Sequence, residues 1–72
     1  MGEDKQYILD LLLKAIQMTR AGGDVVKLEF DEETEVVKVY FDGQTSPGRI
    51  INVAMDSGIA MLKDVINHID IG

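Results

Sequence analysis

A chain of 72 residues with 46% apolar and 28% charged residues is expected to be one small globular domain, residues 1–72, and not a disordered tail. Because so small a domain is marginally stable alone, and because the chain has no cysteine for disulfides or thiolate metal sites, a partner chain is the expected support. The net charge of −6, with seven basic residues of which no two adjoin, disfavours nucleic-acid binding, and no apolar run approaches the roughly 18 residues that span a bilayer.

A first helix is expected to begin near Glu3 or Asp4, to continue to about Arg20, and to be closed by Gly22 in a left-handed conformation. The segment 7–18, YILDLLLKAIQM, is apolar around most of its circumference. One polar stripe interrupts it, made of Asp10, Lys14 and Gln17. A helix that is apolar on nearly all sides indicates burial on more than one side.

Two strands of a hairpin are predicted next, because the apolar period changes from 3.6 to 2 after Asp24. A four-residue loop, residues 32–35, sets the register. The predicted core-facing pairs are Phe30 with Val37, Leu28 with Val39, and Val26 with Phe41. The same loop places Glu29 opposite Lys38. A two-residue loop would instead set Lys27 opposite Lys38, which is unfavourable because like charges repel.

The β-branched segment Arg49 to Met55 predicts a third strand. The alternative is one long helix from Pro47, since proline suits the first helical turn. Against the long helix stands the sequence Asp56-Ser57-Gly58, a capping cluster with Asp56 as a candidate capping side chain. Apolar residues then recur at helical spacing to about Ile69. The expected fold is α+β, in the order αβββα, with a three-stranded antiparallel meander and two helices.

Few residues form a pattern that carries chemistry. The acidic turn Asp31 to Glu35 lacks the alternating ligands and central glycine of a calcium loop, and is interpreted as a solvated turn that discourages pairing with other strands. Ser57 is not part of a G-x-S-x-G motif, and the only histidine, His68, is roughly 16 Å away along the helix. We therefore predict no catalytic residue, no cofactor and no metal site.

A small-ligand or anion-binding module is the alternative function. Backbone N–H groups at the start of the second helix can receive a phosphate or a carboxylate. The candidate ligand-binding residues are Ser57, Gly58, Arg49 and Tyr40.

The leading hypothesis is a small homo-oligomeric interaction protein, with an accessory, regulatory or structural role and no catalysis of its own. The expected partner is a second copy of the chain, most commonly in a two-fold dimer, or else another protein. On the first helix the interface is expected to include whichever of Leu9, Leu13 and Ile16 face away from the sheet, and on the sheet Val25, Tyr40 and Ile50. Because the N-terminus, MGEDKQ, has two acids where a secretory signal would be basic, we expect a soluble, cytoplasmic protein.

Overall fold

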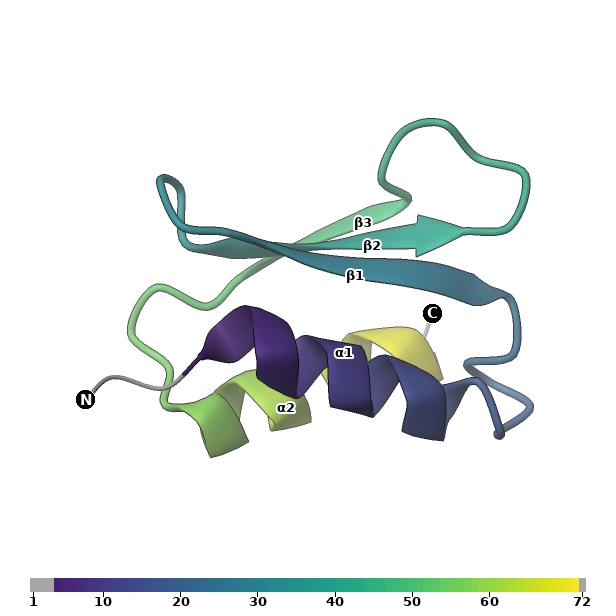
Figure 1. The fold of residues 1–72 in the computed structure, drawn as a ribbon, viewed down its shortest axis with the longest axis horizontal. Helices are drawn as coiled ribbons and strands as arrows, with labels where there is room; N and C mark the ends of the chain where they lie inside the picture. The colour runs from purple at the N-terminus through teal and green to yellow at the C-terminus, as the bar shows by residue number, and fades with distance from the viewer. Residues whose placement is uncertain (1–3, 72) are drawn as a thin grey trace.

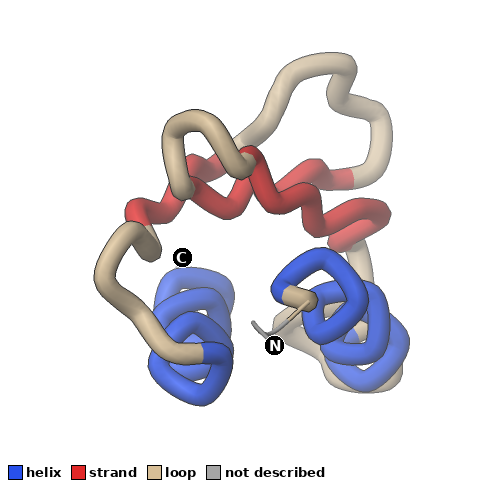
Figure 2. Tube along the Cα trace, turned by 60° about the vertical axis from the view of Figure 1, so that its left-hand side comes forward, coloured by secondary structure: helices blue, strands red, loops and turns tan. Residues whose placement is uncertain are grey.

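The computed structural model describes residues 4–71 and contains the five predicted elements in the predicted order (Figure 1). The elements are α1 Lys5–Ile16, β1 Val25–Asp31, β2 Val36–Phe41, β3 Arg49–Asn52 and α2 Gly58–Ile71. The strands form one antiparallel sheet of order β1-β2-β3, and both helices lie against the same face of it (Figure 2). The α+β prediction is therefore confirmed. Neither described helix is long and apolar enough to cross a membrane.

Helix α1 begins where the sequence predicts but ends earlier. The carboxylate of Asp4 accepts a hydrogen bond from the backbone N–H three residues on (3.0 Å), which makes Asp4 the N-cap, whereas Glu3 lies outside the described residues. The helix ends at Ile16 and not near Arg20. The hydroxyl and the backbone N–H of Thr19 both donate to the carbonyl oxygen of Ile16, at 2.6 and 3.0 Å. This tight turn occupies the carbonyl that the N–H of Arg20 would need to continue the helix.

Gly22 follows α1 because of its small size and not because of a left-handed backbone. Within the described residues, positive φ angles occur at Glu35 and Gly43, so the expectation for Gly22 is wrong. A Cβ atom on Gly22 would lie 2.5 Å from the carbonyl oxygen of Ile16 and 2.8 Å from its Cβ. The chain passes too close to the end of α1 for any side chain at this position.

The β1–β2 hairpin has the predicted four-residue loop but not the whole predicted register. The pairs Phe30–Val37, Leu28–Val39 and Glu29–Lys38 are confirmed. At the other end, Val25 and not Val26 lies opposite Phe41, because a β-bulge between Val25 and Lys27 adds one residue to β1. Val25 is consequently fully buried, whereas the side chain of Val26 is 48% exposed. The prediction that Val26 faces the core is wrong.

The third strand is confirmed, and the alternative of one long helix from Pro47 is wrong. Strand β3 pairs antiparallel with β2 along its length and ends at Asn52, before the predicted end at Met55. The side-chain oxygen of Asn52 accepts a hydrogen bond from the N–H of Ala54 (2.9 Å). This side-chain turn directs the chain away from the sheet.

Helix α2 begins within the predicted capping cluster, with Ser57 as the N-cap. The hydroxyl of Ser57 accepts a hydrogen bond from the N–H of Ala60 (3.2 Å). The capping role expected of Asp56 therefore belongs to its neighbour. One carboxylate oxygen of Asp56, Oδ2, is buried and receives no hydrogen bond. The helix extends to Ile71, slightly beyond the predicted end at Ile69.

The core lies between the sheet and the two helices. Its buried apolar residues are Leu9, Ile16, Val25, Leu28, Val37, Val39, Ile51, Val53, Met61, Val65 and Ile69. Every element contributes at least one of these residues, so the two layers share a single core.

The open edge of β1 is occupied by side chains of α1 and of the residue after it. The carboxamide of Gln6 donates a hydrogen bond to the carbonyl of Leu28 (3.0 Å) and accepts one from the N–H of Phe30 (2.8 Å). Gln17 donates to the carbonyl of Val25 (2.8 Å). These bonds take the place of a neighbouring strand, so they protect β1 from pairing with another chain.

Candidate interaction surface

The residues predicted to bind a small ligand do not converge. Arg49 begins β3 and Ser57 follows its end, so they lie at opposite ends of the sheet, as do the loop before β3 and the start of α2 in Figure 1. Tyr40 lies on the face that points away from the helices, where its hydroxyl is 3.5 Å from a carboxylate oxygen of Glu29. Gly58 is buried in the first turn of α2. These four residues do not form one site.

The charge near the start of α2 also disfavours an anion. The carboxylate of Asp64, together with the burial of Oδ2, raises the pKa of Asp56, while Lys5 acts in the opposite direction. Two neighbouring carboxylates repel an anion and weaken the attraction that a helix N-terminus otherwise offers. The described residues at this end of the molecule therefore give no support to the ligand-binding alternative.

The acidic turn between β1 and β2 is organised by its own backbone. The carboxylate of Asp31 accepts hydrogen bonds from the N–H groups of Thr34 (3.3 Å) and Glu33 (2.9 Å) and lies 3.4 Å from Nζ of Lys38. The two backbone bonds and then Lys38 lower the pKa of Asp31.

Among the described residues, no group of three or more His, Asp and Glu side chains is placed to hold a metal ion. The exposed His68 is within hydrogen-bond distance of a carbonyl of its own helix (2.8 Å).

Three of the residues predicted for an oligomer interface are buried within the chain. Leu9 and Val25 are fully buried, and Ile16 is only 9% exposed. Leu13 is half-buried and packs against the core. Leu9 and Ile16 therefore lie on the side of α1 that faces the sheet, and Leu13 lies partly on that side. The β-bulge turns the side chain of Val25 into the core as well.

The other two predicted interface residues, Tyr40 and Ile50, lie on the outer face of the sheet. Ile50 is 61% exposed and pairs with Lys38 across the β2–β3 ladder. Two ion pairs cover part of this face, Lys27–Glu29 at 3.3 Å and Lys38–Asp31 at 3.4 Å. A sheet face with such charged pairs is compatible with direct solvation, so it gives little support for an interface here.

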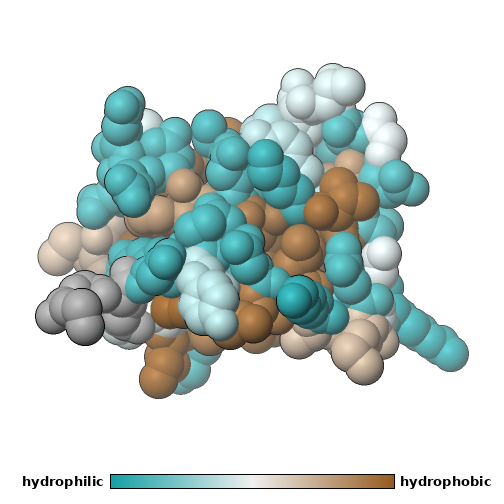
Figure 3. Space-filling model, viewed as in Figure 1, coloured by the Kyte–Doolittle hydropathy of each residue, from teal (hydrophilic) through white to brown (hydrophobic). Residues whose placement is uncertain are grey.

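Half of the large exposed apolar side chains lie on the helices, namely Tyr7, Leu11, Ile59 and Ile66, and the other half lie on the sheet and in loops, namely Met18, Val26, Ile50 and Met55. On α1, Ile8, Leu12 and Ala15 follow one another at helical spacing, with Leu11 beside them. Leu11 and Ala15 are exposed, whereas Ile8 and Leu12 are half-buried against the core. On α2, Ile59, Leu62 and Ile66 form a second stripe, in which Ile59 and Ile66 are exposed and Leu62 is half-buried. We call these seven residues the helix-layer surface. Figure 3 shows hydrophobic side chains along the lower, helix-bearing side, whereas the upper part is mainly hydrophilic.

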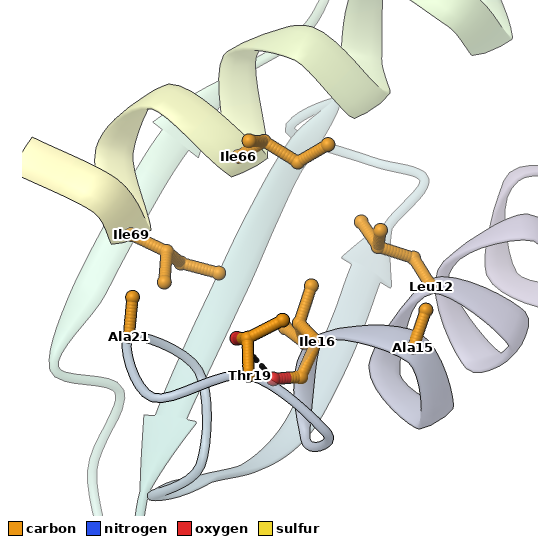
Figure 4. A pocket seen from close by; sticks show the side chains of 7 residues that line it. All are labelled: Leu12, Ala15, Ile16, Thr19, Ala21, Ile66 and Ile69. Atoms are coloured by element: carbon orange, nitrogen blue, oxygen red, sulfur yellow. Dashed lines mark hydrogen bonds between the residues drawn. The ribbon is translucent and has the colours of Figure 1, made fainter.

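An open apolar groove of about 340 Å³ lies between the C-terminal halves of the two helices (Figure 4). The described residues that line it are Leu12, Ala15, Ile16, Thr19, Ala21, Ile66 and Ile69. The hydroxyl of Thr19, the polar group of this lining, is already bonded to the carbonyl of Ile16 (2.6 Å). The groove therefore offers dispersion contacts and little hydrogen bonding to an occupant.

Polar residues flank the helix-layer surface on both sides. Helix α1 carries Asp10 and Lys14 on its outer flank, one turn apart, and α2 carries Lys63 and Asn67. All four side chains are exposed. An apolar patch with a polar rim is the common anatomy of a protein–protein interface.

Comparison with known proteins assigns no family to this chain. No protein-family model matches it, and no curated protein or solved structure matches it either. The functional interpretation therefore rests on the geometry of the surface itself.

Proposed function

We propose that this protein is a small homo-oligomeric interaction module that binds through its helix-layer surface and performs no catalysis of its own. The observation that carries the proposal is the exposed apolar stripe on each helix, with Leu11 50%, Ile59 70% and Ile66 45% exposed. Contiguous apolar patches on small soluble proteins mark sites of association. The role is accessory, regulatory or structural.

A second copy of the chain is the expected partner. The sheet covers one side of the helix layer, and no further element within residues 4–71 covers the other side. It also has no cysteine, so a partner is the remaining means of supporting a small core. A cytoplasmic location suits a chain that needs no disulfide.

The proposal is tested by sedimentation equilibrium on two matched variants. The wild type is expected at a multiple of the chain mass of 8.0 kDa. Leu11→Glu places a charge on the helix-layer surface and is expected to yield the monomer. Ile50→Glu makes the same change at a comparably exposed position, 61% against 50%, on the opposite face of the molecule. This control is expected to associate like the wild type.

Two results would contradict the proposal. One is a compact wild-type monomer of 8.0 kDa at high micromolar concentration. The other is dissociation by Ile50→Glu together with normal association of Leu11→Glu, which would place the interface on the outer face of the sheet.

A further inference from the structure

The helix-layer surface has a hollow at one end and a projection at the other. The groove lies between the C-terminal halves of the helices, with Ile66 in its wall, whereas Ile59, 70% exposed, lies in the first turn of α2. The two positions are roughly 10 Å apart along the helix. Because α1 and α2 run in the same direction (Figure 1), their N-terminal halves carry the projection and their C-terminal halves carry the hollow. A copy turned end for end would bring its projecting Ile59 over this hollow.

The charges on the flank of α1 are self-complementary in the same orientation. Asp10 and Lys14 are exposed, share one flank, and lie two residues before and two residues after Leu12. If two α1 helices pack antiparallel and cross near Leu12, the carboxylate of each Asp10 faces the ammonium group of the other Lys14. If the helices packed parallel and in register, Asp10 would face Asp10 and Lys14 would face Lys14, and these like charges would repel each other.

Building on the proposed function, we infer that a second copy binds antiparallel across a two-fold axis, with α1 packed against α1 of its partner. Leu11 and Leu12 lie near the axis. Ile59 of each copy enters the groove of the other, beside Ala15, and an Asp10–Lys14 pair forms at both rims. Each contact occurs twice, as two-fold symmetry requires. The assembly has two helix layers in the middle and a sheet on either outer side.

Cross-linking tests the orientation, since the chain has no cysteine of its own. Single-cysteine variants Ala15→Cys, Ile59→Cys and Leu11→Cys are treated with a short bismaleimide. Leu11→Cys is expected to cross-link with itself, because it lies near the axis. Ala15→Cys and Ile59→Cys are expected to cross-link when mixed and not separately, because each lies beside the other in the dimer. Efficient self-cross-linking of Ile59→Cys, with no mixed product, would overturn the antiparallel arrangement.

A charge exchange tests the rim. The variants Asp10→Lys and Lys14→Asp each place like charges together in their homodimers, and we expect each to self-associate roughly 5- to 30-fold more weakly than the wild type. Mixed together, they regain both opposite-charge pairs, so the heterodimer is expected to form with nearly wild-type affinity. Each variant also loses the Asp10–Lys14 pair within its own α1, and mixing does not restore that pair. A gain in affinity on mixing therefore reports only the pairs between the two chains.

The outcomes distinguish the orientation from the proposed function. A dimer that is disrupted by Leu11→Glu, but in which the charge-exchanged chains show no preference for each other, keeps the proposed function and overturns the antiparallel contact. A wild-type protein that stays monomeric overturns both. Mixed cross-linking together with preferred heterodimers supports both.

Discussion

At the scale of the residue, Glu35 carries backbone strain that its surroundings impose. Its φ angle is +54°, in the left-handed region that disfavours residues with a Cβ atom. Its N–H donates to the carbonyl of Asp31 (2.8 Å), and its carbonyl accepts from the N–H of Val53 (3.0 Å). These two bonds join the hairpin turn to the end of β3, so the conformation persists despite its cost.

Glu35→Gly should therefore stabilise the protein. Relief of the left-handed strain is worth about 1 to 2 kcal/mol, and the greater freedom of glycine in the unfolded chain offsets part of it, which leaves a gain of about 0.5 to 1 kcal/mol. Urea unfolding measures the difference. Glu33→Gly is the control, since it removes the same carboxylate from the same turn without a positive φ, and it should not stabilise. Equal gains in both variants would mean that charge, and not strain, is responsible.

Two aspartates give the stability opposite dependences on pH. The pKa of Asp31 is lowered by backbone hydrogen bonds and by Lys38, so its contribution is present above the ordinary value of 3.8 and is lost as the pH falls through the folded-state pKa. The pKa of Asp56 is raised by Asp64 and by burial, so its contribution is present below 3.8 and is lost as the pH rises through the folded-state pKa.

The corresponding asparagine variants should consequently differ in sign at neutral pH. Asp31→Asn should destabilise the protein at about pH 7, because it removes a favourable charge, and the deficit should shrink near pH 3.5. Asp56→Asn should stabilise it at about pH 7, because it removes the repulsion from Asp64, and the gain should shrink on acidification. Free energies of unfolding at both pH values provide the measurement. Destabilisation by Asp56→Asn at neutral pH would contradict the assignment.

At the scale of the element, Gln6 links α1 to the edge of β1. Gln6→Ala should cost about 1 to 3 kcal/mol, because it removes three side-chain hydrogen bonds, one of them to Asp10, and leaves a carbonyl and an N–H of β1 without their protein partner. Gln17→Ala removes the single bond to Val25 and should cost less. Chemical denaturation ranks the two variants. Light scattering should also show more aggregation of Gln6→Ala, since it frees a strand edge. Equal costs for the two variants would argue against this role of Gln6.

The rotation of α1 about its axis was the part of the fold that periodicity alone could not determine. The polar residues Asp10, Lys14 and Gln17 predict a single solvent-facing stripe, and the opposite side would then face the sheet. Instead, Gln6 and Gln17 bond to the edge of β1, and this turns the helix so that Leu11 and Ala15 are exposed. A glutamine on a polar stripe gives no sign that its partner is a strand far away in the sequence.

In the strands, too, the sequence pattern predicted local features but not those that depend on residues far apart in the chain. Alternation predicted the hairpin and its four-residue loop, because each depends on neighbouring residues. The bulge after Val25 depends on how Asp24 and Asp42 meet across the strands, where the N–H of Asp42 donates to the carbonyl of Asp24 (2.8 Å). Since Val25 and Val26 are identical in type, composition could not indicate which one enters the core.

At the scale of the whole molecule, two layers cover the apolar residues of the helices on one side only. The sheet buries Leu9, Ile16 and Met61 completely or nearly so. The side chains of Leu11 and Ile59 remain exposed, although they belong to the same helices. In the sequence, this arrangement was indicated by the wide apolar surface of α1, which predicts burial on more than one side of the helix. The width does not identify which apolar residues the sheet leaves exposed.

Association through the helix-layer surface should make the thermal stability depend on concentration, because binding a partner stabilises only the folded chain. For a dimer of chains of this size, each tenfold increase in protein concentration should raise the unfolding midpoint by roughly 3 to 5 °C. Far-UV circular dichroism can follow the transition, since the chain has no tryptophan for fluorescence. In Leu11→Glu the midpoint should be independent of concentration, whereas Ile50→Glu should keep the wild-type dependence. A wild-type midpoint that stays constant over a hundredfold range of concentration would show that the helix layer is stable without a partner.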